Sequence, residues 1–120
     1  MENRTGPVAI VDDDPAVLDS LKFLIEVAGH AVATYASAGK FLEDLVVRPA
    51  CLIVDQHMPG MTGLELAERL RRSGAGVPVM LITGSPSPAI VAKAAQLGIV
   101  RVLEKPPTEA ELLRFVDSHR

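Results

Sequence analysis

Five side chains in this sequence could together bind a phosphoryl group and a cation, and each follows a short apolar run. They are three carboxylates, a hydroxyl and an ammonium: Asp12, Asp13, Asp55, Thr83 and Lys105. Three carboxylates placed close together repel one another and need a counter-charge. Mg²⁺ would supply it, because this ion prefers oxygen ligands in octahedral geometry. A threonine hydroxyl can donate to an oxyanion, and a lysine ammonium pairs with carboxylate or phosphate as a point charge.

The apolar runs before these residues have the length and composition of buried β-strands. The clearest run is Cys51-Leu52-Ile53-Val54, which leads into Asp55 and is followed by the turn dipeptide Pro59-Gly60. Short apolar runs bounded by turn residues are typical of strands buried on both faces, as in parallel sheets. The same pattern predicts five strands, over residues 7–11, 31–35, 51–55, 77–82 and 99–104.

A helical pattern follows each predicted strand. Each helix is preceded by a residue that can cap it: Asp14, Ser37, Thr62, Ser87 and Thr108. Thr62 and Thr108 each stand three residues before a glutamate, which is the spacing of a capping box. The second helix is predicted to carry Leu45 and Val46 on its apolar stripe and to stop at Pro49.

Strands that alternate with helices along a chain of this length predict an α/β fold, a parallel sheet covered by helices on both faces. Right-handed crossovers leave few topologies for such a sheet. The carboxyl ends of its strands share one edge, which is where open α/β sheets bind their ligands. We therefore expect the five side chains to converge in one cleft.

Each of these residues also has an ordinary structural interpretation. Asp55 could simply start a turn, Thr83 could be a plain strand-end residue, and Lys105 could be solvated. Asp14 is better interpreted as a helix cap than as a ligand. His57 is better interpreted as an exposed loop side chain than as a metal ligand. The functional interpretation is favoured because the candidate residues end four different strands.

The bulk composition fits one cytoplasmic domain spanning residues 1–120, with residues 1–6 as a short N-terminal tail. The chain has 120 residues, of which 48% are hydrophobic and 22% charged, so a core can form and disorder is disfavoured. The tail lacks the apolar stretch of a secretion signal. No apolar run approaches the ~20 residues that a membrane span requires.

Several other classes of function are disfavoured by what the sequence lacks. The net charge is −3 with no evident basic face, so direct binding to nucleic acid is not expected. There is no glycine-rich phosphate loop of the kind that binds nucleotides. Zinc is disfavoured because the chain has no pair of histidines at ligand spacing and a single cysteine, Cys51. We interpret Cys51, inside the predicted central strand, as a small buried hydrophobic residue.

Four sequence blocks carry a resemblance to a known family. They are Ile10-Val11-Asp12-Asp13-Asp14, the stretch DQHMPGMTG over 55–63, Ile82-Thr83-Gly84 and Glu104-Lys105-Pro106. Together they resemble the signature blocks of receiver domains from two-component response regulators. The resemblance covers essentially the whole chain. The residues in these blocks are most similar to those of FixJ-like regulators.

The resemblance implies a flavodoxin-like (βα)5 fold with strand order 2-1-3-4-5. It also implies a phosphorylation-controlled switch and not an enzyme in its own right, since a receiver domain promotes only its own phosphorylation and dephosphorylation. The implied partner is a sensor histidine kinase or a phosphotransfer protein. A homodimer would form through the face of the fourth helix, fifth strand and fifth helix.

The resemblance also assigns roles to the candidate residues. Asp55 would be the phosphoacceptor, and Thr83 and Lys105 would bind the phosphoryl oxygens. Mg²⁺, for which Mn²⁺ can substitute, would be held by three carboxylates and one main-chain carbonyl: Asp12, Asp13, Asp55 and His57 (carbonyl only).

Two positions depart from the family pattern. Receiver domains usually carry an aromatic switch residue three positions before the lysine, and here that residue is Val102. Valine has no ring that could move between exposed and buried positions. The second departure is Pro107, which follows Pro106 where phenylalanine is more familiar. The Lys105-Pro106 bond is expected to be cis, as it usually is in this family.

Two other classes of function compete with the switch. A phosphatase or phosphotransferase with an aspartyl-phosphate intermediate needs a second acid/base carboxylate, often two residues after the nucleophile, where this chain has His57. A degenerate receiver domain that only binds proteins would usually lack an acidic residue, the phosphoacceptor or the lysine. All of these are present. The sequence leaves open whether the chain is a complete regulator or part of a longer one.

Overall fold

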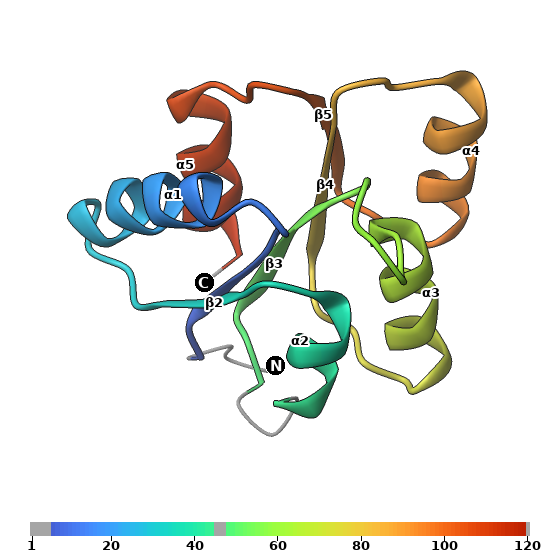
Figure 1. Ribbon diagram of the computed structural model, residues 1–120, viewed down its shortest axis with the longest axis horizontal. Coiled ribbons are helices and arrows are strands. Elements are labelled where there is room, and N and C mark those ends of the chain that lie inside the picture. Colours follow the sequence, from blue (N-terminus) through green and yellow to red (C-terminus); the bar gives the residue numbers. More distant parts are fainter. Residues whose placement is uncertain (1–5, 45–47, 120) are drawn as a thin grey trace.

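The computed structural model describes residues 6–44 and 48–119. Within these ranges, strands and helices alternate from one end of the chain to the other (Figure 1). The strands are β1 (Val8–Val11), β2 (Val32–Tyr35), β3 (Cys51–Asp55), β4 (Val79–Thr83) and β5 (Arg101–Glu104). The helices are α1 (Pro15–Val27), α2 (Ala38–Glu43), α3 (Gly63–Arg72), α4 (Pro88–Gln96) and α5 (Glu109–Ser118).

The strands form one parallel sheet in the order β2-β1-β3-β4-β5, as the family resemblance implied. β1 lies between β2 and β3, so that Val8 is aligned with Val32 on one side and Cys51 on the other. At the carboxyl edge, Asp55 is aligned with Ile82 of β4. This register brings the last residues of the central strands to the same edge.

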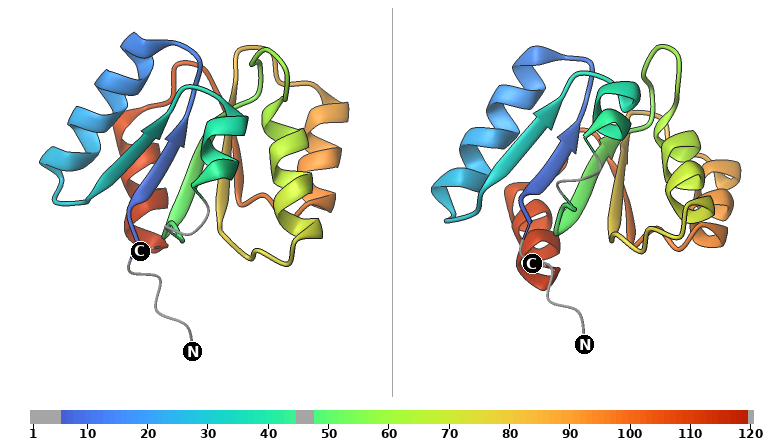
Figure 2. Two further views of the ribbon diagram at one scale, coloured as in Figure 1. Left: turned by 60° about the horizontal axis from the view of Figure 1, so that its bottom comes forward. Right: turned by 90° about the horizontal axis from the view of Figure 1, so that it is seen from below.

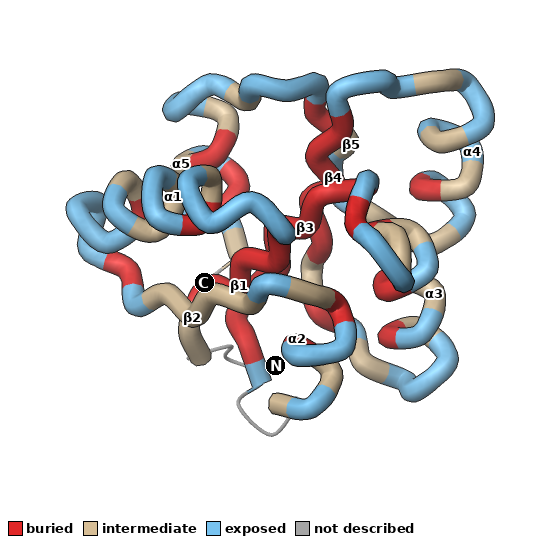
Figure 3. Tube along the Cα trace, viewed as in Figure 1, coloured by how far each residue is buried: buried red, intermediate tan, exposed pale blue. Residues whose placement is uncertain are grey.

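Helices cover both faces of the sheet, α1 and α5 on one face and α2, α3 and α4 on the other (Figures 1 and 2). Alternate residues of β3 enter different clusters. Cys51 and Ile53 pack with α1 and α5, whereas Leu52 and Val54 pack with α2 and α3. The central strands are therefore buried along their whole length (Figure 3). That burial explains why their sequences are continuously apolar.

The predicted caps begin the helices as expected. An oxygen of Asp14 accepts a hydrogen bond from the Ala16 N–H at 2.9 Å, which confirms this aspartate as a cap. Both capping boxes are present, with Thr62 paired to Glu65 and Thr108 paired to Glu111. These bonds satisfy N–H groups that the first helical turn leaves unpaired.

Some predicted boundaries were wrong by a few residues. β4 begins at Val79 and not at residue 77, because Pro78 has no N–H to give to the sheet. The Pro78 carbonyl still accepts the Leu52 N–H at 2.9 Å. α2 ends at Glu43, and the predicted helical residues Leu45 and Val46 lie outside the described residues. Of the predicted tail, only Gly6 is described.

Two further expectations about individual residues are confirmed. The Lys105-Pro106 peptide bond is cis. Cys51 has no exposed surface, and burial raises the pKa of its thiol to about 12. A thiol held in its neutral form is a poor nucleophile and a poor metal ligand.

None of the helices described within residues 6–44 and 48–119 combines the length and the apolar character needed to cross a membrane.

Candidate functional site

The sheet brings the five candidate side chains to its carboxyl edge. Asp12 and Asp13 directly follow β1, Lys105 directly follows β5, and Asp55 and Thr83 are the last residues of β3 and β4. Asp12, Asp55 and Thr83 are buried, whereas Asp13 is exposed. The five residues therefore share the edge of the sheet at which the sequence predicted them.

Three carboxylates at this edge could hold a divalent cation. One oxygen each of Asp12, Asp13 and Asp55 lies within 4.8 Å of the others. All three ligand atoms are hard oxygens, which suits Mg²⁺ or Mn²⁺ better than zinc. Oδ1 of Asp55 is buried, and its one close polar neighbour among the described residues is the Lys105 ammonium at 3.0 Å. A carboxylate has lone pairs for a cation as well as for an ammonium, so this cluster of side chains fits the ion that the family resemblance implied.

Lys105 supplies the positive charge nearest to the carboxylates. Its ammonium lies 3.0 Å from Asp55 Oδ1 and 4.0 Å from Asp12 Oδ2. Burial by itself lowers the pKa of Lys105, but the hydrogen bond and the charge of Asp55, followed by the charges of Asp12 and Asp13, raise it above its ordinary value. Lys105 therefore stays protonated and can face an anion.

One ammonium does not compensate three carboxylates. Burial raises the pKa of Asp12 above its ordinary value, and the charges of Asp55 and Asp13 raise it further. A hydrogen bond from the Asp14 N–H to Asp12 Oδ1, at 2.9 Å, and the charge of Lys105 act in the opposite direction. The net upward shift shows that the fold holds Asp12 where its negative charge is unfavourable. A bound dication would stabilise the charged form of Asp12 against its burial and against the neighbouring carboxylates.

The loop after β3 is held by a buried side chain that the sequence did not single out. Gln56 is buried, and its Oε1 accepts a hydrogen bond from the Leu64 N–H at 2.9 Å. Its main-chain N–H donates to the Ile82 carbonyl at 2.8 Å, and its carbonyl accepts the Gly63 N–H at 3.1 Å. These bonds tie the β3 end to the first turn of α3. A polar residue directly after an apolar strand was the only signal for this role.

Gly63 lies against the main chain of Asp55. A β-carbon at this position would come 2.8 Å from the Asp55 carbonyl oxygen and 2.6 Å from Leu81 Cδ1. Contacts that short force neighbouring atoms to move. The close approach of α3 to the end of β3 therefore requires glycine at residue 63.

We expect Gly63→Ala to lower the free energy of unfolding by about 2 kcal/mol, the size typical of overpacking. Urea denaturation would measure this change. Gly39→Ala is the matched control, because Gly39 is exposed in α2 and its nearest side-chain atom would be 3.9 Å away. That control should be neutral or stabilising by about 0.5–1 kcal/mol, as for glycine in a helix interior. Equal effects of the two substitutions would contradict close packing at Gly63.

Thr83 and His57 are joined by a hydrogen bond that the sequence did not predict. His57 is an exposed loop residue, as expected, yet its Nε2 lies 3.1 Å from Thr83 Oγ1. The same Thr83 oxygen accepts the Ser85 N–H at 3.1 Å. Nothing in the spacing of the two residues, one after β3 and one at the end of β4, indicates that their side chains meet.

Comparison with known proteins identifies the family. The family model described as the response regulator receiver domain matches residues 8–117. The chain belongs to this family. The predicted resemblance is therefore confirmed, and the receiver-domain match includes all of the residues at the carboxyl edge.

Curated relatives support the FixJ-like placement. The transcriptional regulatory protein FixJ of Azorhizobium caulinodans is 40% identical over 111 residues, which cover 92% of this chain and 53% of that protein. The response regulator protein TodT of Pseudomonas putida is 39% identical over 115 residues, covering 94% of this chain and 50% of that protein. The receiver domain described here thus spans about half the length of these relatives.

Solved structures confirm the fold. The crystal structure of FixJ-N superposes with a TM-score of 0.84 at 33% identity, covering 98% of this chain and 93% of that one. The chemotaxis protein CheY4 of Vibrio cholerae gives a TM-score of 0.87 at 25% identity, covering 97% and 99% of the two chains. The (βα)5 flavodoxin-like architecture expected from the sequence is the one observed.

In this receiver domain, Val102 is partly buried. It packs against the apolar cluster on the α2–α4 side of the sheet, together with Ile90 of α4. The position that usually carries an aromatic ring is thus filled by a small, stiff side chain. Thr83 has no exposed surface and belongs to the neighbouring strand, where Leu81 is aligned with Val102.

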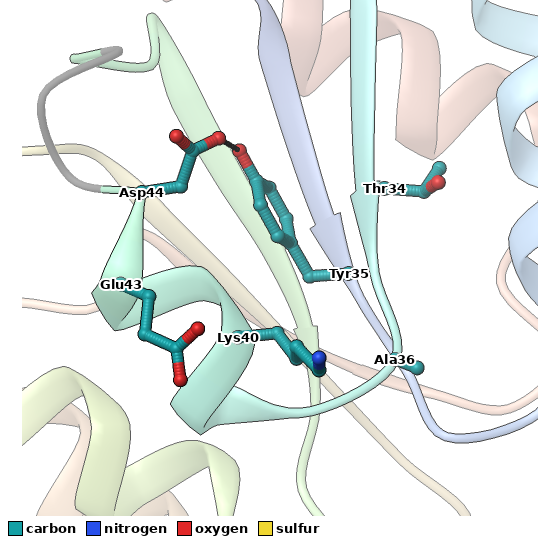
Figure 4. A pocket seen from close by; sticks show the side chains of 6 residues that line it. All are labelled: Thr34, Tyr35, Ala36, Lys40, Glu43 and Asp44. Carbon is teal, nitrogen blue, oxygen red and sulfur yellow. Dashed lines mark hydrogen bonds between the residues drawn. The ribbon is translucent and has the colours of Figure 1, made fainter.

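A pocket of the receiver domain lies between β2 and α2, and none of the five candidate residues lines it (Figure 4). Its lining residues come from the end of β2 and from α2: Thr34, Tyr35, Ala36, Lys40, Glu43 and Asp44. The Tyr35 hydroxyl donates to Asp44 Oδ2 at 2.7 Å. Burial, together with this bond and the charge of Asp44, raises the pKa of Tyr35 to about 12. This contact therefore ties the end of α2 to β2.

Proposed function

We propose that this receiver domain accepts a phosphoryl group on Asp55 from a sensor histidine kinase or a phosphotransfer protein, in a reaction that depends on Mg²⁺. One observation carries the proposal. The buried Asp55 carboxylate lies at the carboxyl edge of the sheet, 3.0 Å from the Lys105 ammonium and grouped with Asp12 and Asp13. This arrangement places a cation site and a fixed positive charge beside one nucleophilic carboxylate.

The proposed chemistry is an in-line transfer between a phosphohistidine and Asp55. One Asp55 carboxylate oxygen forms the new bond to phosphorus, while the bond between phosphorus and the donor imidazole nitrogen breaks. That nitrogen keeps the electron pair. Lys105 stabilises the negative charge on the transferring oxygens, and Thr83 donates its hydroxyl to one of them. Such transfers are catalysed chiefly by positioning and by electrostatic stabilisation.

The cation would be held by Asp12, Asp13, an oxygen of Asp55 and the main-chain carbonyl of His57. When bound, Mg²⁺ or Mn²⁺ would supply positive charge to the transferring group. Asp12 and Asp13 then serve to hold that charge beside Asp55. Because Asp55 contacts Lys105 and lies beside Asp12 and Asp13, its carboxylate is held in place before the donor arrives.

We infer that the domain is a switch rather than a multiple-turnover phosphatase. The second class needs an acid/base carboxylate near the nucleophile, often two residues further on, and His57 is in that place with its Nε2 at 3.1 Å from Thr83. A small phosphodonor such as acetyl phosphate with Mg²⁺ separates the possibilities. The switch is expected to give one phosphoryl group per chain, released by hydroxylamine as an acyl phosphate. Steady turnover of diverse phosphoesters would favour an enzyme, and no adduct would favour a protein-binding module only.

The proposed partners follow from the same function. A histidine kinase or phosphotransfer protein would reach Asp55 from the carboxyl edge. We expect this to happen in the cytoplasm. The surface formed by α4, β5 and α5 would carry the output and could pair two copies. Arg101 of β5 and Glu111 of α5 lie 3.7 Å apart within that surface. Binding to nucleic acid is not assigned to this segment.

Phosphorylation is expected to move the backbone between Thr83 and Leu97 although Val102 has no ring to reorient. Charge-assisted bonds from Thr83 and Lys105 to the phosphoryl group are worth ~1.5–3 kcal/mol each. A bias of a few kcal/mol moves a two-state equilibrium substantially, since ~5.5 kcal/mol carries it from 1:99 to 99:1. Ser87 caps α4, so displacement of the segment after β4 pulls on that helix.

Amide chemical shifts with and without beryllofluoride, which mimics a phosphoryl group, would measure this movement. We expect the largest changes at the start of α4. The far end of that helix is held by Arg71, whose Nε donates to the Leu97 carbonyl at 2.8 Å. The Val102 methyl groups should shift little. Changes limited to the immediate neighbours of Asp55 would mean that the aromatic residue is required for output.

A further inference from the structure

The hydroxyl of Thr83 is already occupied before any phosphoryl group is present. Its oxygen accepts the Ser85 N–H at 3.1 Å and lies 3.1 Å from His57 Nε2. Thr83 has no exposed surface, whereas His57 is exposed. A loop side chain therefore reaches the one hydroxyl that the proposed reaction needs as a donor.

The direction of the His57–Thr83 bond follows from the number of protons available. A hydroxyl has one proton to donate and two lone pairs that accept. The Ser85 N–H uses one lone pair of Thr83, so a hydroxyl that donates to an unprotonated Nε2 satisfies both partners. In the reverse arrangement the Thr83 proton would have no acceptor among the hydrogen bonds found within 6–44 and 48–119. A buried unpaired donor is costly. Thr83 is therefore the donor and His57 Nε2 the acceptor.

The loop holds the imidazole in place from both sides. Before His57, the side chain of Gln56 is bonded to the Leu64 N–H at 2.9 Å. After it, Met58 is 7% exposed and belongs to the apolar cluster on the α2–α3 face. With both neighbours fixed, His57 keeps its orientation toward β4 at little additional entropic cost.

We propose that His57 is a positioning residue that holds the Thr83 hydroxyl in the unphosphorylated state and must release it when a phosphoryl group binds. This inference rests on the proposed function, because it concerns the group that Thr83 would bind after phosphorylation. The hydroxyl has one proton, so it cannot donate to His57 and to a phosphoryl oxygen together. The bond to His57 therefore opposes the phosphorylated conformation, in which Thr83 donates to the phosphoryl group. Its strength sets part of the free energy that phosphorylation must supply to switch the domain.

The first test needs no phosphoryl group. The nitrogen chemical shifts of the His57 ring, recorded in mildly alkaline buffer, should show Nδ1 protonated and Nε2 as a hydrogen-bond acceptor. Thr83→Val removes the hydroxyl at nearly constant shape and should shift the Nε2 resonance of His57. A protonated Nε2 in the wild-type protein, or an Nε2 resonance that Thr83→Val leaves in place, would overturn the proposal.

The second test measures the affinity for beryllofluoride at saturating Mg²⁺. His57→Phe keeps a planar ring but has no acceptor, and we expect it to tighten binding about fivefold, the effect of losing one neutral hydrogen bond that competes with the ligand. His57→Gln is the conservative control. Its side-chain oxygen reaches about as far as Nε2, so it should restore an affinity close to that of the wild type.

The same substitutions in a Thr83→Val background separate a specific bond from general access to the site. With no hydroxyl to hold, His57→Phe should change the affinity by less than about twofold. An equal effect in both backgrounds would show that the ring acts by shielding Asp55, and no effect in either would show that the bond is unimportant. Both results overturn the proposal. Failure of the wild-type protein to bind beryllofluoride would overturn the proposed function itself, and the role of His57 with it.

Discussion

Replacing Asp55 with asparagine is expected to abolish phosphorylation of the protein. The amide keeps the shape of the carboxylate but is not a nucleophile toward phosphorus, and it removes the charge that faces Lys105 at 3.0 Å. After incubation with acetyl phosphate and Mg²⁺, intact-protein mass spectrometry should show one added phosphoryl group on the wild type and none on Asp55→Asn.

Asp19→Asn provides the matched control, since Asp19 is an exposed residue of α1 that does not belong to the cluster of Asp12, Asp13 and Asp55. It should gain a phosphoryl group at the wild-type rate. Phosphorylation of Asp55→Asn at a rate similar to that of the control would move the phosphoacceptor to another residue. A small residual rate on the time scale of hours would leave the assignment intact, because Asp12 and Asp13 lie nearby.

Removing both remaining carboxylates is the second change with a large expected effect. Asp12→Ala combined with Asp13→Ala deletes two of the three carboxylates that lie within 4.8 Å of one another. Magnesium binding, followed by titration calorimetry, should be lost. The phosphorylation rate should fall roughly 100-fold or more, the usual cost of losing electrostatic stabilisation at a reacting group.

Asp14→Ala is the control for this double substitution, because it removes a negative charge next to the cluster in sequence without removing a proposed Mg²⁺ ligand. Asp14 is next to the cluster in sequence, but its carboxylate caps α1 through the Ala16 N–H at 2.9 Å. Its removal should cost about 1 kcal/mol of stability, as for other caps, and leave the Mg²⁺ affinity within about twofold. If the double substitution bound Mg²⁺ as tightly as Asp14→Ala does, the carboxylate site would be wrong.

The parts of this structure that the sequence predicted are those governed by local pattern. The continuous apolar run of β3 predicted a strand buried on both faces, because no polar residue interrupts either set of alternating side chains. The Asp14 cap and the Thr62 and Thr108 capping boxes depend on residues at fixed short spacings, and they occur where predicted. Convergence at one edge followed from parallel pairing, which alternation of strands and helices requires.

The parts that the sequence could not predict depend on side-chain geometry between distant segments. His57 and Thr83 are separated by 26 residues, and only the register of β3 against β4 brings them together. Gln56 resembles any polar residue after a strand until the fold shows its side chain bonded to α3. The end of α2 at Glu43 was also missed, because the apolar stripe in the sequence continues beyond it.

Direct mapping of the phosphorylated residue tests the central claim most closely. Acyl phosphates are reduced by borohydride, so the phosphorylated wild-type protein can be treated with labelled borohydride, digested and sequenced by mass spectrometry. The account predicts that residue 55 alone is converted from aspartate to labelled homoserine, and only after exposure to phosphodonor and Mg²⁺. Label at Asp12, at Asp13 or at a residue away from the carboxyl edge, with Asp55 unmodified, would contradict it.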